Sequence, residues 1–148
     1  MIEFYNALKA MLPVDLKAHV IYPQWVDGAG KSRPPALADY PYVLLWGSPG
    51  DEFSGEPDNA SLGDCLDGKE FRFKATYVGV TPEALSIALK RCRTAWNRKT
   101  PEVAGFHCSK LRQSSLTDAQ ADTDVVITGT SSHPLFAVDE FVLVASSL

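Results

Sequence analysis

The chain has 148 residues, of which 45% are hydrophobic and 22% are charged, and its formal net charge at pH 7 is -4. A chain of this length is expected to form a single domain, residues 1–148, and to bury roughly 70% of the surface that the unfolded chain exposes. No apolar run approaches the ~20 residues that a helix needs to cross a bilayer, which argues against insertion into a membrane. The three cysteines are odd in number and widely spaced, which argues against a complete disulfide framework and favours a reducing compartment.

The first part of the chain predicts a short helix followed by two strands. In residues 2–12, IEFYNALKAML, apolar side chains recur at helical spacing, and Pro13 ends the pattern. Residues 16–23, LKAHVIYP, alternate as a half-buried strand does. Residues 41–47, PYVLLWG, form a compact apolar run typical of a central strand that is buried on both faces. The centre of the core is therefore expected at 41–47.

The segment 48–68 is polar and rich in carboxylates. It is too long for an ordinary connection between two elements, so we expect a functional loop or arm. Its acidic residues, which no Lys or Arg within the segment opposes, are Asp51, Glu52, Glu56, Asp58, Asp64 and Asp67.

Residues 71–96, FRFKATYVGVTPEALSIALKRCRTAW, predict a strand, a tight turn and a helix. Alternation gives the strand an apolar face and a polar face. The apolar face holds Phe71, Phe73, Ala75 and Tyr77, and the polar face holds Arg72, Lys74 and Thr76. Gly79 permits the turn, Thr81 is a suitable N-cap and Pro82 suits the first helical position. The buried stripe of the helix is expected to consist of Leu85, Ala88, Leu89, Cys92, Ala95 and Trp96.

Three further strands are predicted beyond Pro101, at residues 105–112, 124–129 and 138–146. The helix between the third and fourth strands permits a right-handed crossover with parallel neighbours, whereas the hairpin-like pairs are expected to be antiparallel. The element order predicts an α+β fold, with a mixed, mainly antiparallel β-sheet of about five to six strands and two α-helices packed on one face.

No local motif for catalysis, cofactor binding or metal binding stands out. Residues 28–32, GAGKS, look like the end of a phosphate-binding loop, but Trp25 occupies the position of the required first glycine and the proline pair at 34–35 blocks the helix that must follow. A small nucleotide-binding domain is therefore the less favoured interpretation. The three histidines are scattered and no Cys-x-x-Cys occurs, so we predict no metal site, no cofactor and no catalytic residue. Cys92 is expected to be a buried apolar side chain.

Basic side chains gather in the C-terminal half of the predicted helix, where the helix dipole favours cations. They are Lys90, Arg91, Arg93, Arg98 and Lys99. This cluster is open to three interpretations: a solvated face, contact with nucleic acid, or contact with the acidic 48–68 segment of another copy. The net negative charge disfavours independent DNA binding. The candidate interface residues are accordingly Arg91 and Arg93, with Arg72 and Lys74 from the polar face of the strand.

With these residues in view, the chain resembles the tail terminator proteins of long-tailed bacteriophages (siphophages), particularly those that infect actinobacteria. Three stretches carry the resemblance. They are PYVLLWG (41–47) with its polar loop, the strand, V-G-x-T-P turn and amphipathic helix of 71–96, and LFAVDEFVLVAS (135–146), which is similar to the closing strand of the family. Together with the N-terminal helix, the resemblance covers most of the chain. The GAGKS motif matches no feature of the family, and the segment 48–68 is longer and more acidic than a strand connection requires.

The resemblance implies a structural virion protein and not an enzyme. Such a subunit assembles in the host cytoplasm into a homo-hexameric ring at the head-tail junction, caps the head-proximal end of the tail tube, stops tube polymerisation and offers a docking surface for the head connector. The implied partners are other copies, the tail tube protein and the head-tail connector or stopper protein, while DNA passes through the ring without specific binding. A head-tail stopper or tail-completion protein of the neck is the alternative.

Under this interpretation, acidic side chains lining the lumen would repel the phosphates of the passing DNA. The candidates for the lumen or for a tube-contacting loop are Asp51, Glu52, Glu56 and Asp58.

Overall fold

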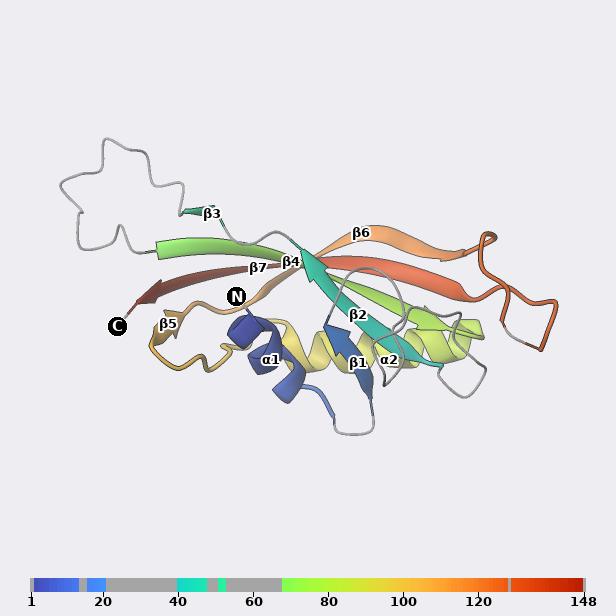
Figure 1. Cartoon of the computed structure of the whole chain (residues 1–148), viewed down its shortest axis with the longest axis horizontal. Coiled ribbons are helices and arrows are strands. Elements are labelled where there is room, and N and C mark those ends of the chain that lie inside the picture. Colours follow the sequence, from blue (N-terminus) through green and yellow to red (C-terminus); the bar gives the residue numbers. More distant parts are fainter. Residues whose placement is uncertain are drawn as a thin grey trace.

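The computed structural model describes residues 2–13, 16–20, 40–47, 51–52, 68–127 and 129–147. Within these residues the chain forms two α-helices and one seven-stranded sheet (Figure 1). In chain order the elements are α1 (Ile2–Ala10), β1 (Lys17–Val20), β2 (Tyr42–Gly47), β3 (Asp51–Glu52), β4 (Gly68–Gly79), α2 (Pro82–Trp96), β5 (Phe106–Cys108), β6 (Arg112–Ala121) and β7 (Leu135–Ser147). The GAGKS motif and most of the predicted loop at 48–68 lie outside the described residues.

The sheet is built around a long antiparallel pair, β4 and β7. All 12 residues of β4 pair with residues 135–146 of β7. On the other side of β4, β2 runs antiparallel to it, and β1 runs parallel to β2. Both β5 and β6 pair antiparallel with β7, β5 near its C-terminal end and β6 along its N-terminal part. The predicted α+β fold with a mixed, mainly antiparallel sheet is confirmed.

The parallel pair is not the one that the predicted crossover favoured. Strands β4 and β5, which precede and follow α2, are not neighbours, because β7 lies between them in the sheet. The parallel pair is instead β1 with β2.

The junction of β4 with α2 follows the predicted turn chemistry. Thr81 is the N-cap, and its side-chain oxygen accepts a hydrogen bond of 3.1 Å from the backbone N–H of Ala84. Pro82 begins the helix, where its missing N–H costs no hydrogen bond. Position 79 has no room for a side chain, because a Cβ atom there would lie only 2.8 Å from the backbone nitrogen of Leu85. The turn therefore sets α2 close against the end of β4.

Both helices pack on the same face of the sheet, as predicted (Figure 1). Phe73 of β4 and Phe141 of β7 stack with ring centroids 5.2 Å apart, and Trp96 of α2 packs edge-on against both rings. The indole N–H of Trp96 donates a 2.9 Å hydrogen bond to the backbone carbonyl of Leu8, which ties α2 to α1. One turn earlier in α1, Phe4 packs on the ring of Phe71 with centroids 4.3 Å apart. These aromatic contacts join the two helices and the central strands into one core.

A second, smaller apolar cluster lies on the opposite face of the sheet. Tyr42 and Leu44 of β2 meet Val78 of β4 there, and Ile127 from the connection between β6 and β7 covers them. Val43 and Leu45 of β2 belong to the core under the helices. The prediction that 41–47 forms a strand buried on both faces is therefore confirmed.

The predicted strands after α2 need correction. The stretch 105–112 is not one strand, because β5 ends at Cys108 and β6 begins at Arg112. The polar strand β6 itself was missed. No strand covers the described part of 124–129, where Ile127 packs into the second cluster instead. The last strand begins earlier than predicted, at Leu135.

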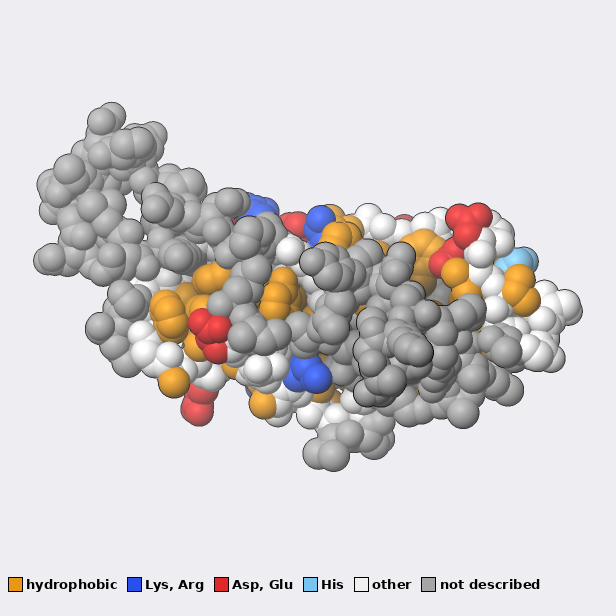
Figure 2. All heavy atoms as spheres, in the orientation of Figure 1, with side chains coloured by type: hydrophobic (Ala, Val, Ile, Leu, Met, Phe, Trp, Pro, Cys, Tyr) orange, Lys and Arg blue, Asp and Glu red, His pale blue; other side chains and the backbone are white. Residues whose placement is uncertain are grey.

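The surface drawn in Figure 2 carries mixed charges. Among the described residues on this face, positive and negative side chains are spread over several elements and do not gather into one patch of either sign. On this face the described charged side chains therefore occur in small local groups.

Candidate interaction surfaces

A buried charge cluster connects α2 to the sheet. Asp139 of β7 is only 1% exposed. Its two carboxylate oxygens accept hydrogen bonds of 2.7 Å from the Nε and Nη2 groups of Arg93. The hydroxyl of Tyr77 donates to the same carboxylate at 3.0 Å, and the amide of Gln113 donates at 3.2 Å. One side chain of β7 thus holds partners from α2, β4 and β6.

The electrostatics of this cluster favour the charged form of Arg93 and the protonated form of Tyr77. The hydrogen bond to Asp139 is the main cause that raises the pKa of Arg93, so the guanidinium stays charged. Burial, followed by the charge of Asp139, raises the pKa of Tyr77, so the phenol stays protonated as a donor. We conclude that the guanidinium of Arg93, a predicted interface residue, is already engaged inside its own chain.

Sequence reasoning missed Asp139, although the sequence contains a signal for it. In the closing strand, the alternation that buries Ala137 and Phe141 places position 139 on the same inward face. A carboxylate at a core position needs a charged partner, and Arg93 lies beside the buried stripe of α2.

The two other predicted contact residues of the strand, Arg72 and Lys74, lie on the sheet face opposite the helices. The Arg72 guanidinium contacts the carboxylates of Glu70 and Glu140 at 3.3 and 3.4 Å. The Lys74 ammonium lies 4.6 Å from the ring centroid of Trp46. Both cations therefore have partners in their own chain.

Of the predicted acidic loop at 48–68, the structure describes only residues 51, 52 and 68. Asp51 and Glu52 form β3, where they pair with Glu70 and Lys69 of β4. Their side chains, and Glu56 and Asp58 altogether, lie outside the described residues. The loop is therefore anchored at the end of β4 remote from α2.

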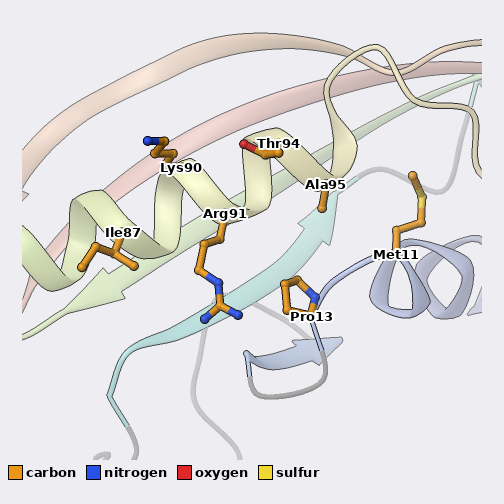
Figure 3. A pocket seen from close by; sticks show the side chains of 7 residues that line it. All are labelled: Met11, Pro13, Ile87, Lys90, Arg91, Thr94 and Ala95. Carbon is orange, nitrogen blue, oxygen red and sulfur yellow. The ribbon is translucent and has the colours of Figure 1, made fainter.

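Arg91, the last predicted interface residue, lines a groove of about 520 Å³ on the outer side of α2. The groove is lined by Met11, Pro13, Ile87, Lys90, Arg91, Thr94 and Ala95. Figure 3 shows Ile87, Arg91 and Ala95 on the side of α2 where Pro13 lies, with Lys90 and Thr94 at the opposite rim. Arg91 also interacts within its own chain. This predicted cationic site therefore adjoins an open apolar groove.

The described residues contain no group of three or more His, Cys, Asp or Glu side chains that would hold a metal ion. Burial is the main cause that raises the pKa of the Cys92 thiol to about 12, and the residue is fully buried as predicted. Within the described part of the chain, neither helix has the length and apolar character needed to cross a bilayer.

The sequence matches no protein-family model and no curated protein.

Proposed function

We propose that the chain is a ring-forming tail terminator of a long-tailed bacteriophage, which caps the head-proximal end of the tail tube, stops tube polymerisation and carries the docking surface for the head connector. Its place is the head-tail junction of the virion. Its partners are further copies in a homo-hexameric ring, the tail tube protein and the head-tail connector.

One observation carries the proposal: the three stretches that resemble the family are neighbours in space. They form β2, β4 with α2, and β7, and these strands adjoin in the order β2-β4-β7. The resemblance therefore covers one packed unit of the fold and not three unrelated pieces. This unit is fastened internally by the Arg93 and Asp139 pair, so it is suited to serve as a rigid subunit.

The outer surfaces of this unit suit contacts between copies. Within the described residues, the outer edge of β6 pairs with no strand, so its backbone groups are available to a neighbouring chain. The outer side of α2 adds the apolar groove. A ring subunit needs such surfaces, because its function is completed by its neighbours.

Deletion of the gene in the parent phage, followed by electron microscopy of the lysates, tests the proposal. A terminator predicts overlong tails without heads. Full capsids beside unattached tails of normal length would instead indicate the alternative, a head-tail stopper. Tails of normal length attached to heads would refute both functions.

A further inference from the structure

The outer side of α2 exposes apolar surface that the chain's described residues leave uncovered. Ile87 is 59% exposed, the largest exposure among the large hydrophobic side chains identified on the described surface. It lines the 520 Å³ groove together with Met11 and Pro13. Figure 3 shows Ile87 at one end of the view, Met11 at the end of α1 on the other side, and Pro13 between them. Ile87 is not an isolated exposed side chain, because Met11, Pro13 and Ala95 line the same groove, and grouped apolar surface of this kind is typical of a docking site.

The charge of this groove is one-sided. Among the described residues that line it, the ionisable ones are Lys90 and Arg91, and none is acidic. Arg91 is engaged within its own chain, whereas Lys90 is exposed at the rim and supplies positive charge to a ligand. A ligand for this groove should therefore combine apolar side chains with carboxylates.

The chain itself contains a segment with this chemistry. Residues 51–67 include six acidic side chains and no Lys or Arg, although the whole chain carries both signs. Apolar residues occur among the acidic ones at Phe53, Leu62 and Leu66. The segment thus complements the groove in charge and offers apolar side chains for Ile87.

We propose that the α2 groove of one copy binds the acidic segment 51–67 of a neighbouring copy. The proposal rests on the proposed function, because it requires several copies in one assembly. The two ends of the segment are fixed at the end of β4 remote from α2, by the pairing of β3 with Glu70 and Lys69 and by the start of β4 at Gly68. We therefore commit to the groove of a neighbour, and binding to the chain's own groove is an outcome of the test.

Cross-linking between two full-length versions of the protein tests this contact. One version carries Thr94→Cys at the groove with Cys65→Ser, and the other keeps Cys65 within the acidic segment. Both carry Cys108→Ser, and different tags distinguish them. A short bismaleimide should join the two versions into a covalent heterodimer through Cys65 and position 94. A matched control replaces Thr94→Cys by Ser131→Cys, at an exposed position in the connection before β7.

Charge reversal tests the chemistry of the contact. Lys90→Glu in the groove version should lower the heterodimer yield by about tenfold, because it places like charges together. Lys110→Glu makes the same change at an exposed residue that does not line the groove and should leave the yield unchanged. Glu56→Lys in the other version should restore part of the yield lost with Lys90→Glu.

Three results would overturn the proposal. They are equal yields at positions 94 and 131, equal effects of Lys90→Glu and Lys110→Glu, and a cross-link that forms only inside a chain that carries both Cys65 and Thr94→Cys. The outcome is separable from the proposed function. If the cross-link fails but the deletion phage makes overlong tails, only the docking contact is refuted. If heterodimers form but the deletion phage makes tails of normal length, only tail termination is refuted.

Discussion

Replacement of Arg93 by methionine tests the buried cluster around Asp139. The Arg93→Met variant keeps an aliphatic stem and removes the two guanidinium donors that lie 2.7 Å from the carboxylate. Asp139 is 1% exposed and would retain only the neutral donors of Tyr77 and Gln113, at 3.0 and 3.2 Å. The variant therefore leaves a buried carboxylate without its charged partner.

The expected loss follows from burial. Removing one partner of a buried ion pair costs about 3–5 kcal/mol of the free energy of unfolding. The Arg93 side chain is 34% exposed, so solvent screens part of the interaction and we expect the lower end, about 3 kcal/mol. Arg72→Met is the matched control, because its two contacts are longer and its side chain is 51% exposed. Such exposed pairs are worth about 0–1 kcal/mol.

Urea denaturation of the full chain, monitored by tryptophan fluorescence, measures the free energy of unfolding that each variant loses. A third variant combines Arg93→Met with Asp139→Asn, which removes the stranded charge and should recover a large part of the stability. Equal losses for Arg93→Met and Arg72→Met would refute the reasoning. So would a double variant that is less stable than Arg93→Met alone.

Three further predictions concern the turn, the buried thiol and the acidic loop. Gly79→Ala should lower the free energy of unfolding by about 1–3 kcal/mol, because its Cβ would meet the backbone of Leu85, and an unchanged urea midpoint would contradict this close contact. Because burial raises the pKa of Cys92 from 9.0 to about 12, the folded state keeps a proton that the unfolded state loses in this range. Stability should therefore fall as pH rises from about 9 to about 12, by up to about 1.4 kcal/mol per pH unit, and alkaline denaturation series should show a shallower fall for Cys92→Ala. Conversion of the four candidate lumen residues to Asn or Gln should slow genome passage or impair assembly. These residues are Asp51, Glu52, Glu56 and Asp58. Wild-type infectivity of the fourfold variant would refute the lumen hypothesis.

The unit β4–α2 could be predicted from sequence because several independent signals agree there. Apolar and polar residues alternate from Phe71 onward, which indicates the strand. The cap at Thr81 and the proline at position 82 then both indicate that a helix begins there. The closing strand was predictable for the same reason, since its apolar residues alternate over most of its length.

Strand β6 could not be predicted from the same signals. Its sequence, RQSSLTDAQA, is polar, and most of its side chains are exposed because it lies at the edge of the sheet. Register shifts near Thr117 also break its alternation. Its pairing is set by the long partner β7, which local sequence does not reveal.

The candidate site was predicted only in part. The sequence shows that Arg91 and Arg93 are cations on the predicted helix, but whether each one faces solvent or a buried carboxylate depends on the tertiary fold. Arg93 and Arg91 are two residues apart on α2, yet Arg93 reaches into the sheet while Arg91 lines the outer groove. Only the packing of α2 on β7 separates these roles.

The pairing of Arg93 with Asp139 also constrains how this chain can change over generations. Loss of Arg93 alone leaves the buried carboxylate of Asp139 without its charged partner, so an exchange of this pair that begins at Arg93 passes through an unstable intermediate. Apolar pairs remain accessible once both have changed. We therefore expect the two positions to covary among descendants of this sequence, as a record of selection for the folded subunit rather than for any partner.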